Sequence, residues 1–121
     1  MKKLTIAFVI FWGLGTSVLA QQAKQVKDEP TFRNLIVDTK WTNAWGNTVL
    51  EIKSNGTLAG KSTKDGKIKG TWYWKGKKFC RKGTVGAVSL KEDCQKFYMV
   101  GNHILKIVSK NSPKGSYWFL R

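Results

Sequence analysis

The sequence predicts an all-β fold: a small antiparallel meander of about eight strands, closed into a barrel or folded into a sandwich, with one disulfide. Residues 67–75 alternate between two kinds of side chain, which is the period of a strand with one buried face. Asn55-Gly56 and Asp65-Gly66 are strong hairpin signals between such runs. Short runs separated by turn residues continue to the C-terminus, a spacing typical of barrels and sandwiches.

The first 20 residues have the three parts of a secretory signal peptide. Lys2 and Lys3 give a positive start, residues 4–15 are almost wholly apolar, and Val18 and Ala20 suit a cleavage site. The apolar run is shorter than the ~20 residues that a membrane span needs. We therefore expect cleavage after Ala20, no transmembrane segment in the mature chain, and an exported protein that is periplasmic or secreted.

The mature chain of about 100 residues has the size of one domain. Residues 21–30 are polar, lack an apolar period and end in Pro30. We interpret residues 21–33 as a flexible N-terminal arm. Residues 34–121 are predicted to form a single β domain.

Within that domain, the order of apolar runs and turn residues predicts each element. Residues 82–93 form the longest predicted connection, and no helix is expected. Ile68, Gly70, Trp72 and Trp74 share the predicted core face of their strand. The five tryptophans beyond residue 20 are expected to fill the interior rather than line a ligand cavity. The predicted strands are residues 35–40, 48–53, 57–62, 67–74, 77–81, 94–100, 103–109 and 116–120.

Two cysteines, Cys80 and Cys94, lie in the part predicted to be exported. An even cysteine count in an exported chain indicates a disulfide. The alternative is a metal site that adds His103, but these three ligands have no recognisable spacing. We therefore expect a disulfide, and no metal or cofactor.

Three short motifs carry a resemblance to a known family. They are Gly70-Thr71-Trp72, Phe79-Cys80-Arg81 and Asp93-Cys94-Gln95. Together with Asn55-Gly56-Thr57 and Trp118, they resemble a family of small exported bacterial proteins of unknown function, over roughly residues 35–121. The resemblance implies a secreted β fold with a paired cysteine. It implies no activity, cofactor or catalytic residue.

No catalytic pattern is found, so a non-enzymatic protein is expected. Residues 56–62 resemble a phosphate-binding loop, but only three residues separate the glycines where four are needed. Glu92 and Asp93 are adjacent, and adjacent residues of an extended chain point to opposite faces. His103 is the only histidine, and no nucleophile-elbow sequence accompanies it.

The strongest functional signal is positive charge. The chain has 22 Lys and Arg against seven Asp and Glu, a formal net charge of +15. Nine of the 22 residues from Lys61 to Lys82 are basic. Positive charge with an interleaved aromatic suits anionic polymers, whereas a solvated face is the plainer alternative. The predicted anion-binding residues are Lys67, Lys69, Tyr73, Lys75, Lys77, Lys78 and Arg81.

The composition leaves the partner open. Lipopolysaccharide, acidic glycan and nucleic acid fit the charge equally well, although lysine rather than arginine argues against sequence-specific recognition. A first alternative is an inhibitor of an exported enzyme, with residues 21–33 as the segment that enters a cleft. A second alternative, a carrier of apolar ligands, is disfavoured by the bulk of the tryptophans.

Overall fold

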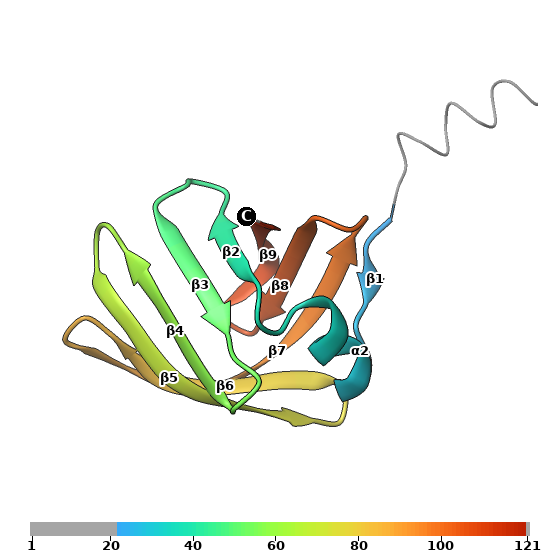
Figure 1. Cartoon of the computed structure of the whole chain (residues 1–121), viewed down its shortest axis with the longest axis horizontal. Helices are drawn as coiled ribbons and strands as arrows, with labels where there is room; N and C mark the ends of the chain where they lie inside the picture. The colour runs from blue at the N-terminus through green and yellow to red at the C-terminus, as the bar shows by residue number, and fades with distance from the viewer. Residues whose placement is uncertain (1–21, 121) are drawn as a thin grey trace, which may run out of the picture.

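The structure, a computed structural model, describes residues 22–120, and the predicted signal peptide lies outside this range. Nine strands and one short helix make up the described part of the chain (Figure 1). The elements are β1 (Lys24–Gln25), α2 (Glu29–Leu35), β2 (Lys40–Asn43), β3 (Thr48–Ile52), β4 (Thr57–Ser62), β5 (Gly66–Lys75), β6 (Lys78–Val85), β7 (Val88–Val100), β8 (Ile104–Ser109) and β9 (Ser112–Leu120).

Strands β2 to β9 form a closed antiparallel barrel, which confirms the all-β prediction and selects the barrel over the sandwich. Each strand from β2 to β9 pairs with the next one along the chain. The ring closes because β2 also pairs with β9, where Trp41 lies opposite Leu120. Closure leaves few unpaired strand edges. Strand β1 adds to β7 outside the ring, with Lys24 opposite Met99.

Strand β7 is long because it pairs with two neighbouring strands of the barrel, one after the other. Its first half pairs with β6 as far as Gln95, and its second half pairs with β8 from Lys96 onward. The predicted connection at residues 82–93 is therefore wrong: β6 and β7 run through it and turn at Gly86. The many polar residues in this stretch made it resemble a loop. Gly83 is part of β6, where a Cβ would clash with the Lys69 carbonyl oxygen.

The alternation on β5 is confirmed. Trp72 is buried and Ile68 and Trp74 pack against the core, whereas the alternate residues Lys67, Lys69 and Lys75 are exposed. The predicted strand over residues 35–40 is wrong, because α2 occupies its start and β2 begins only at Lys40.

The predicted flexible arm at residues 21–33 is also wrong over the residues described. Asp28 caps α2 by accepting a hydrogen bond of 2.8 Å from the Thr31 backbone N–H, and a proline stands in the first turn. Val26 and Phe32 are both buried. The two apolar side chains tie the segment to the barrel, so the ordered domain begins before residue 34.

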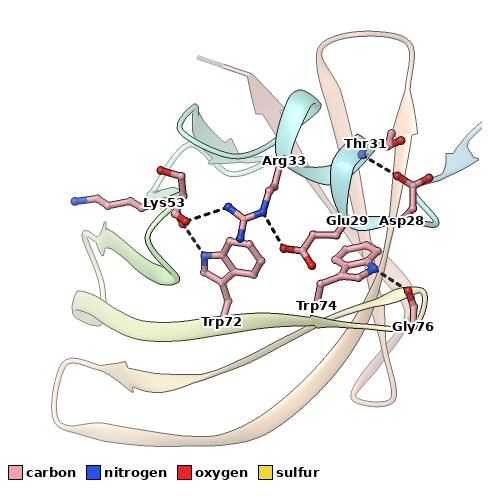
Figure 2. A network of polar contacts seen from close by, with 9 residues as sticks. Asp28, Glu29, Thr31, Arg33, Lys53, Trp72, Trp74 and Gly76 are labelled. Carbon is pink, nitrogen blue, oxygen red and sulfur yellow. Dashed lines mark hydrogen bonds and ion pairs between the residues drawn. The ribbon is translucent and has the colours of Figure 1, made fainter.

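Phe32 anchors the helix in an aromatic cluster at one end of the barrel. Its ring stacks on Trp74 at 4.9 Å and meets Phe79 and Phe97 at 5.4 and 5.5 Å, measured between centroids. Figure 2 shows Arg33 from the same helix beside Trp72, with its guanidinium carbon 5.0 Å from that ring's centroid. In Figure 1, α2 covers the end at which β5 turns into β6, and the β6–β7 turn projects at the other end.

The predicted disulfide is confirmed. Cys80 on β6 lies directly opposite Cys94 on β7, and their sulfur atoms are 2.07 Å apart. Cys80 is also opposite Tyr73, so the bridge lies on the outward side of the sheet. It joins the two strands next to the point where β7 changes partner.

The tryptophans fill the interior only in part. Trp41 and Trp72 are buried in the core, but Trp45 is 85% exposed in the turn between β2 and β3. Trp118 lines a cavity of about 210 Å³ inside the barrel. The expectation of a filled interior is therefore wrong, because the side chains of β3 to β9 leave this cavity between them.

Candidate functional site

Most of the predicted anion-binding residues lie on the outer face of the barrel. Lys67, Lys69, Tyr73 and Lys75 alternate with the core residues of β5 and are exposed. Lys78 begins β6 directly opposite Lys75, and it too is exposed. Lys77 is an exposed residue of the turn that joins the two strands. The pleat of one hairpin thus brings these residues together.

Arg81 does not belong to this face, contrary to the prediction. It lies opposite Trp72, and residues directly opposite in an antiparallel pair point to the same side of the sheet. Its side chain is therefore directed into the barrel, where Nη2 lies 3.7 Å from the Asp93 carboxylate and Nη1 donates to the Lys91 carbonyl at 2.9 Å. The prediction counted charges along the chain without following the alternation of β6.

Two further lysines on the outer face were not in the predicted set. Lys61 on β4 lies opposite Lys67, and Lys82 on β6 lies opposite Thr71; both lysines are exposed. The hairpin signal at Asp65-Gly66 could have placed Lys61, since its register follows from that turn. We define the cationic face as Lys61, Lys67, Lys69, Lys75, Lys78 and Lys82.

Two pairs of like charges stand directly opposite each other within the cationic face. Lys61 pairs with Lys67 across β4 and β5, and Lys75 pairs with Lys78 across β5 and β6. Like charges in such positions destabilise a sheet. Within residues 22–120 the ion pairs are Arg33–Glu29 and Arg81–Asp93, so no carboxylate within ion-pairing distance neutralises these lysines.

Tyr73 lies in the middle of the face and is 46% exposed. Its hydroxyl donates a hydrogen bond to the Glu92 carboxylate on β7. This bond stabilises the protonated phenol and raises the pKa of Tyr73, with smaller contributions from desolvation and from the charge of Glu92. Glu92 therefore fixes the hydroxyl of Tyr73, and the flat face of the Tyr73 ring stays near the lysines.

A groove of about 510 Å³ lies beside the cationic face, where β7 changes partner from β6 to β8. Three lysines line it, together with Glu92, Asp93 and one half of the disulfide. The three are Lys78, Lys96 and Lys110, which stand far apart in the sequence. Because the groove depends on the bend of β7, sequence alone could not place it.

The described residues hold no grouping of the kind that metal chemistry needs. Over residues 22–120, no three His, Cys, Asp or Glu side chains gather where they could hold a metal ion. In the same range, no helix has the length and apolar character to cross a membrane.

Comparison with protein families, with curated proteins and with solved structures finds no match to this chain. The resemblance to the family of small exported bacterial proteins therefore stays a prediction.

Proposed function

We propose that this chain is an exported, non-enzymatic β-barrel domain that binds an anionic polymer or envelope surface through its cationic face. The observation that carries the proposal is the pair of directly opposed lysines at Lys61–Lys67 and again at Lys75–Lys78. A face that only keeps a protein soluble gains nothing from opposed like charges, which cost stability. An anion that bridges them removes the repulsion.

Export is supported by two independent features. Residues 1–20 have the pattern of a signal peptide, and the Cys80–Cys94 bridge is of the kind that persists in oxidising compartments. We therefore propose a periplasmic or secreted location, where lipopolysaccharide, acidic glycan and extracellular nucleic acid are the available anionic partners.

The chemistry of the face favours repeated negative charges over a single specific group. Lysine presents a point charge on a flexible stem and does not make the forked contacts of arginine. The charges lie on neighbouring strands, about 5 Å apart. At a physiological screening length of ~8 Å they therefore reinforce one another. The exposed Tyr73 ring adds a surface for a base or a sugar.

The alternative of an enzyme inhibitor loses its main element. Residues 21–33 were its natural segment to enter a cleft, but Val26 and Phe32 are buried against the barrel. No other described feature favours it.

The test is a pair of triple variants with equal changes in charge. Lys67, Lys69 and Lys75 are changed to Gln in one, and the exposed Lys24, Lys27 and Lys114 in the other. Binding to heparin, lipopolysaccharide and DNA is measured over a range of salt concentrations. The first variant should bind more weakly, and on DNA its salt slope should flatten by up to ~1 unit for each phosphate that the protein no longer neutralises.

Both variants should fold, because surface substitutions usually change stability by no more than about 0.5 kcal/mol. Equal losses of affinity in the two variants would mean that the net charge acts diffusely and that no face is involved. A parent protein that binds none of the three polymers at low salt would refute the proposal.

A further inference from the structure

The barrel interior contains an apolar cavity of about 210 Å³ that the proposed function does not use. Its walls come from residues of seven strands, β3 to β9, among them Leu50, Leu58, Ile68, Ile107 and Trp118. A cavity of about 150 Å³ holds one benzene molecule, so this space takes an apolar group of roughly eight carbon atoms.

The cavity has a closed end and an open end. Phe79 and Phe97 line it, and both rings also contact Phe32 of α2. The aromatic cluster therefore forms the floor. Val85 and Leu90, near the β6–β7 turn, line the cavity and are partly exposed. We infer that the mouth is here, because the β6–β7 turn lies at the end of the barrel opposite the helix (Figure 1).

One charged side chain is directed into this apolar space. Arg81 lines the cavity, and its position opposite Trp72 on the inward face places it there. A guanidinium has five N–H donors. Among the described residues it makes one hydrogen bond, from Nη1 to the Lys91 carbonyl, and the Asp93 carboxylate at 3.7 Å from Nη2 is beyond hydrogen-bond distance. Donors of Arg81 therefore remain available to a ligand.

Asp93 lies directly opposite Arg81 across β6 and β7, so both side chains are on the inner side of the sheet. The Asp93 carboxylate accepts a hydrogen bond of 3.1 Å from Gln95, and Asp93 is not among the residues that line the cavity. The other polar residues of the lining are Gln95, Ser116, Lys69 and Lys82. The two lysines are exposed on the outer face, and their backbone carbonyls lie beside Gly83 and Gly70. The lining thus combines one positively charged side chain, Arg81, with apolar walls. The net charge of the whole chain is also strongly positive.

We propose that the barrel binds a small amphipathic anion: a carboxylate on an apolar body of roughly eight carbons, the size scaled from a cavity that holds benzene. The carboxylate accepts hydrogen bonds from Arg81, and the apolar body occupies the space above Phe79 and Phe97. This site is separate from the cationic face, whose lysines point outward.

The probe is octanoate, with 1-octanol as its neutral analogue, titrated into the purified protein with its disulfide intact. Binding is followed by backbone amide shifts in nuclear magnetic resonance spectra. Octanoate should bind with saturation, and it should shift the amide signals of residues that line the cavity. It should bind at least roughly tenfold more tightly than 1-octanol, the difference expected of one charge-assisted hydrogen bond.

Two pairs of variants separate the head site from the apolar body. Changing Arg81→Gln together with Asp93→Asn neutralises both charges without leaving either unpaired, and it should abolish the preference for octanoate over 1-octanol. Leu90→Trp should block the mouth, whereas Ser89→Trp on the exposed outer face of the same strand should leave binding unchanged. A triple Lys→Gln variant of Lys61, Lys67 and Lys75, none of which lines the cavity, should bind octanoate like the parent.

Three outcomes would overturn the inference. They are octanoate shifts confined to surface lysines, equal affinity for octanoate and 1-octanol in the parent, and unchanged octanoate binding in the folded Leu90→Trp variant.

Discussion

Phe32 on α2 stacks on Trp74 of β5 with their ring centroids 4.9 Å apart. Figure 2 shows how Trp74 is held beneath the helix: its indole N–H donates a hydrogen bond of 2.7 Å to the Gly76 carbonyl. Phe32 also contacts two of the rings that line the barrel cavity. A seven-residue helix thus closes one end of the barrel through a single wholly buried side chain.

The first prediction concerns that side chain. Phe32→Ala should lower the free energy of unfolding by about 3–5 kcal/mol, because it removes a ring packed on four others and leaves a cavity. Urea unfolding followed by fluorescence measures the loss. A small domain with about 5–15 kcal/mol of total stability would come close to its limit.

Leu35→Ala is the matched control, since Leu35 is on the same helix but is 42% exposed. It should cost much less than Phe32→Ala. Deletion of residues 21–33 should destabilise the barrel as strongly as Phe32→Ala. A deletion variant with the parent's urea midpoint would restore the interpretation of this segment as a free arm.

A second prediction concerns the acid sensitivity of the helix cap. The hydrogen bond from the Thr31 backbone N–H holds the pKa of the Asp28 carboxyl below its ordinary value of 3.8. The ionised carboxylate therefore stabilises the folded state above pH 3.8, and this contribution is lost as the pH falls through the lowered pKa.

Asp28→Asn keeps a side-chain oxygen for the cap but does not titrate. The difference in urea midpoint between parent and variant should shrink as the pH falls below 3.8. Asp28→Ala should be less stable than Asp28→Asn at neutral pH. A difference between parent and Asp28→Asn that stays constant down to pH 2 would contradict the assignment.

A third prediction concerns the disulfide. Cys80 and Cys94 are 14 residues apart, and a bridge that closes a loop of this length stabilises a chain by about 3 kcal/mol in the chain-entropy model. Changing both cysteines to alanine should lower the free energy of unfolding by about that amount, and reduction of the parent should have a similar effect. If a fully reduced parent unfolds at the same urea concentration as the oxidised form, the bridge contributes nothing.

The strands that carry a clear alternation or a hairpin turn could be predicted from the sequence. Asn55-Gly56 and Asp65-Gly66 bound β4, and the alternation of β5 assigns Trp72 to the core and Lys69 to the surface. Helix α2 was missed, because seven residues are too few to show a helical period. Asp28 and Pro30 are nevertheless a helix-start signal that could have indicated it.

The candidate sites were less predictable, because they depend on register across strands. Arg81 lies inside because the turn at Gly76 pairs Lys75 with Lys78, which puts every odd residue of early β6 on the inner face. The bulge between Arg81 and Gly83 in the pairing of β6 with β7 then fixes where Asp93 lies. Neither feature has a local signature, so the cavity and its one arginine could be found only in the folded chain.

The last prediction tests whether the cationic face costs stability. Lys61 and Lys67 lie directly opposite each other on the outer face of β4 and β5. Lys67→Gln should therefore raise the free energy of unfolding at low salt, by roughly 0.2–1 kcal/mol, and the gain should shrink as salt screens the charges.

Lys69 is the matched control, because it lies on the same strand and face but opposite Ala59 and Thr84. Lys69→Gln should leave stability nearly unchanged at every salt concentration. In a cycle of Lys61→Gln, Lys67→Gln and the double variant, the second neutralisation should add less than the first, because either change alone removes the repulsion. The same substitutions should weaken binding to heparin, so that stability and affinity move in opposite directions. If Lys67→Gln and Lys69→Gln behave alike in urea, the opposed lysines are not strained, and the main support for a binding face is lost.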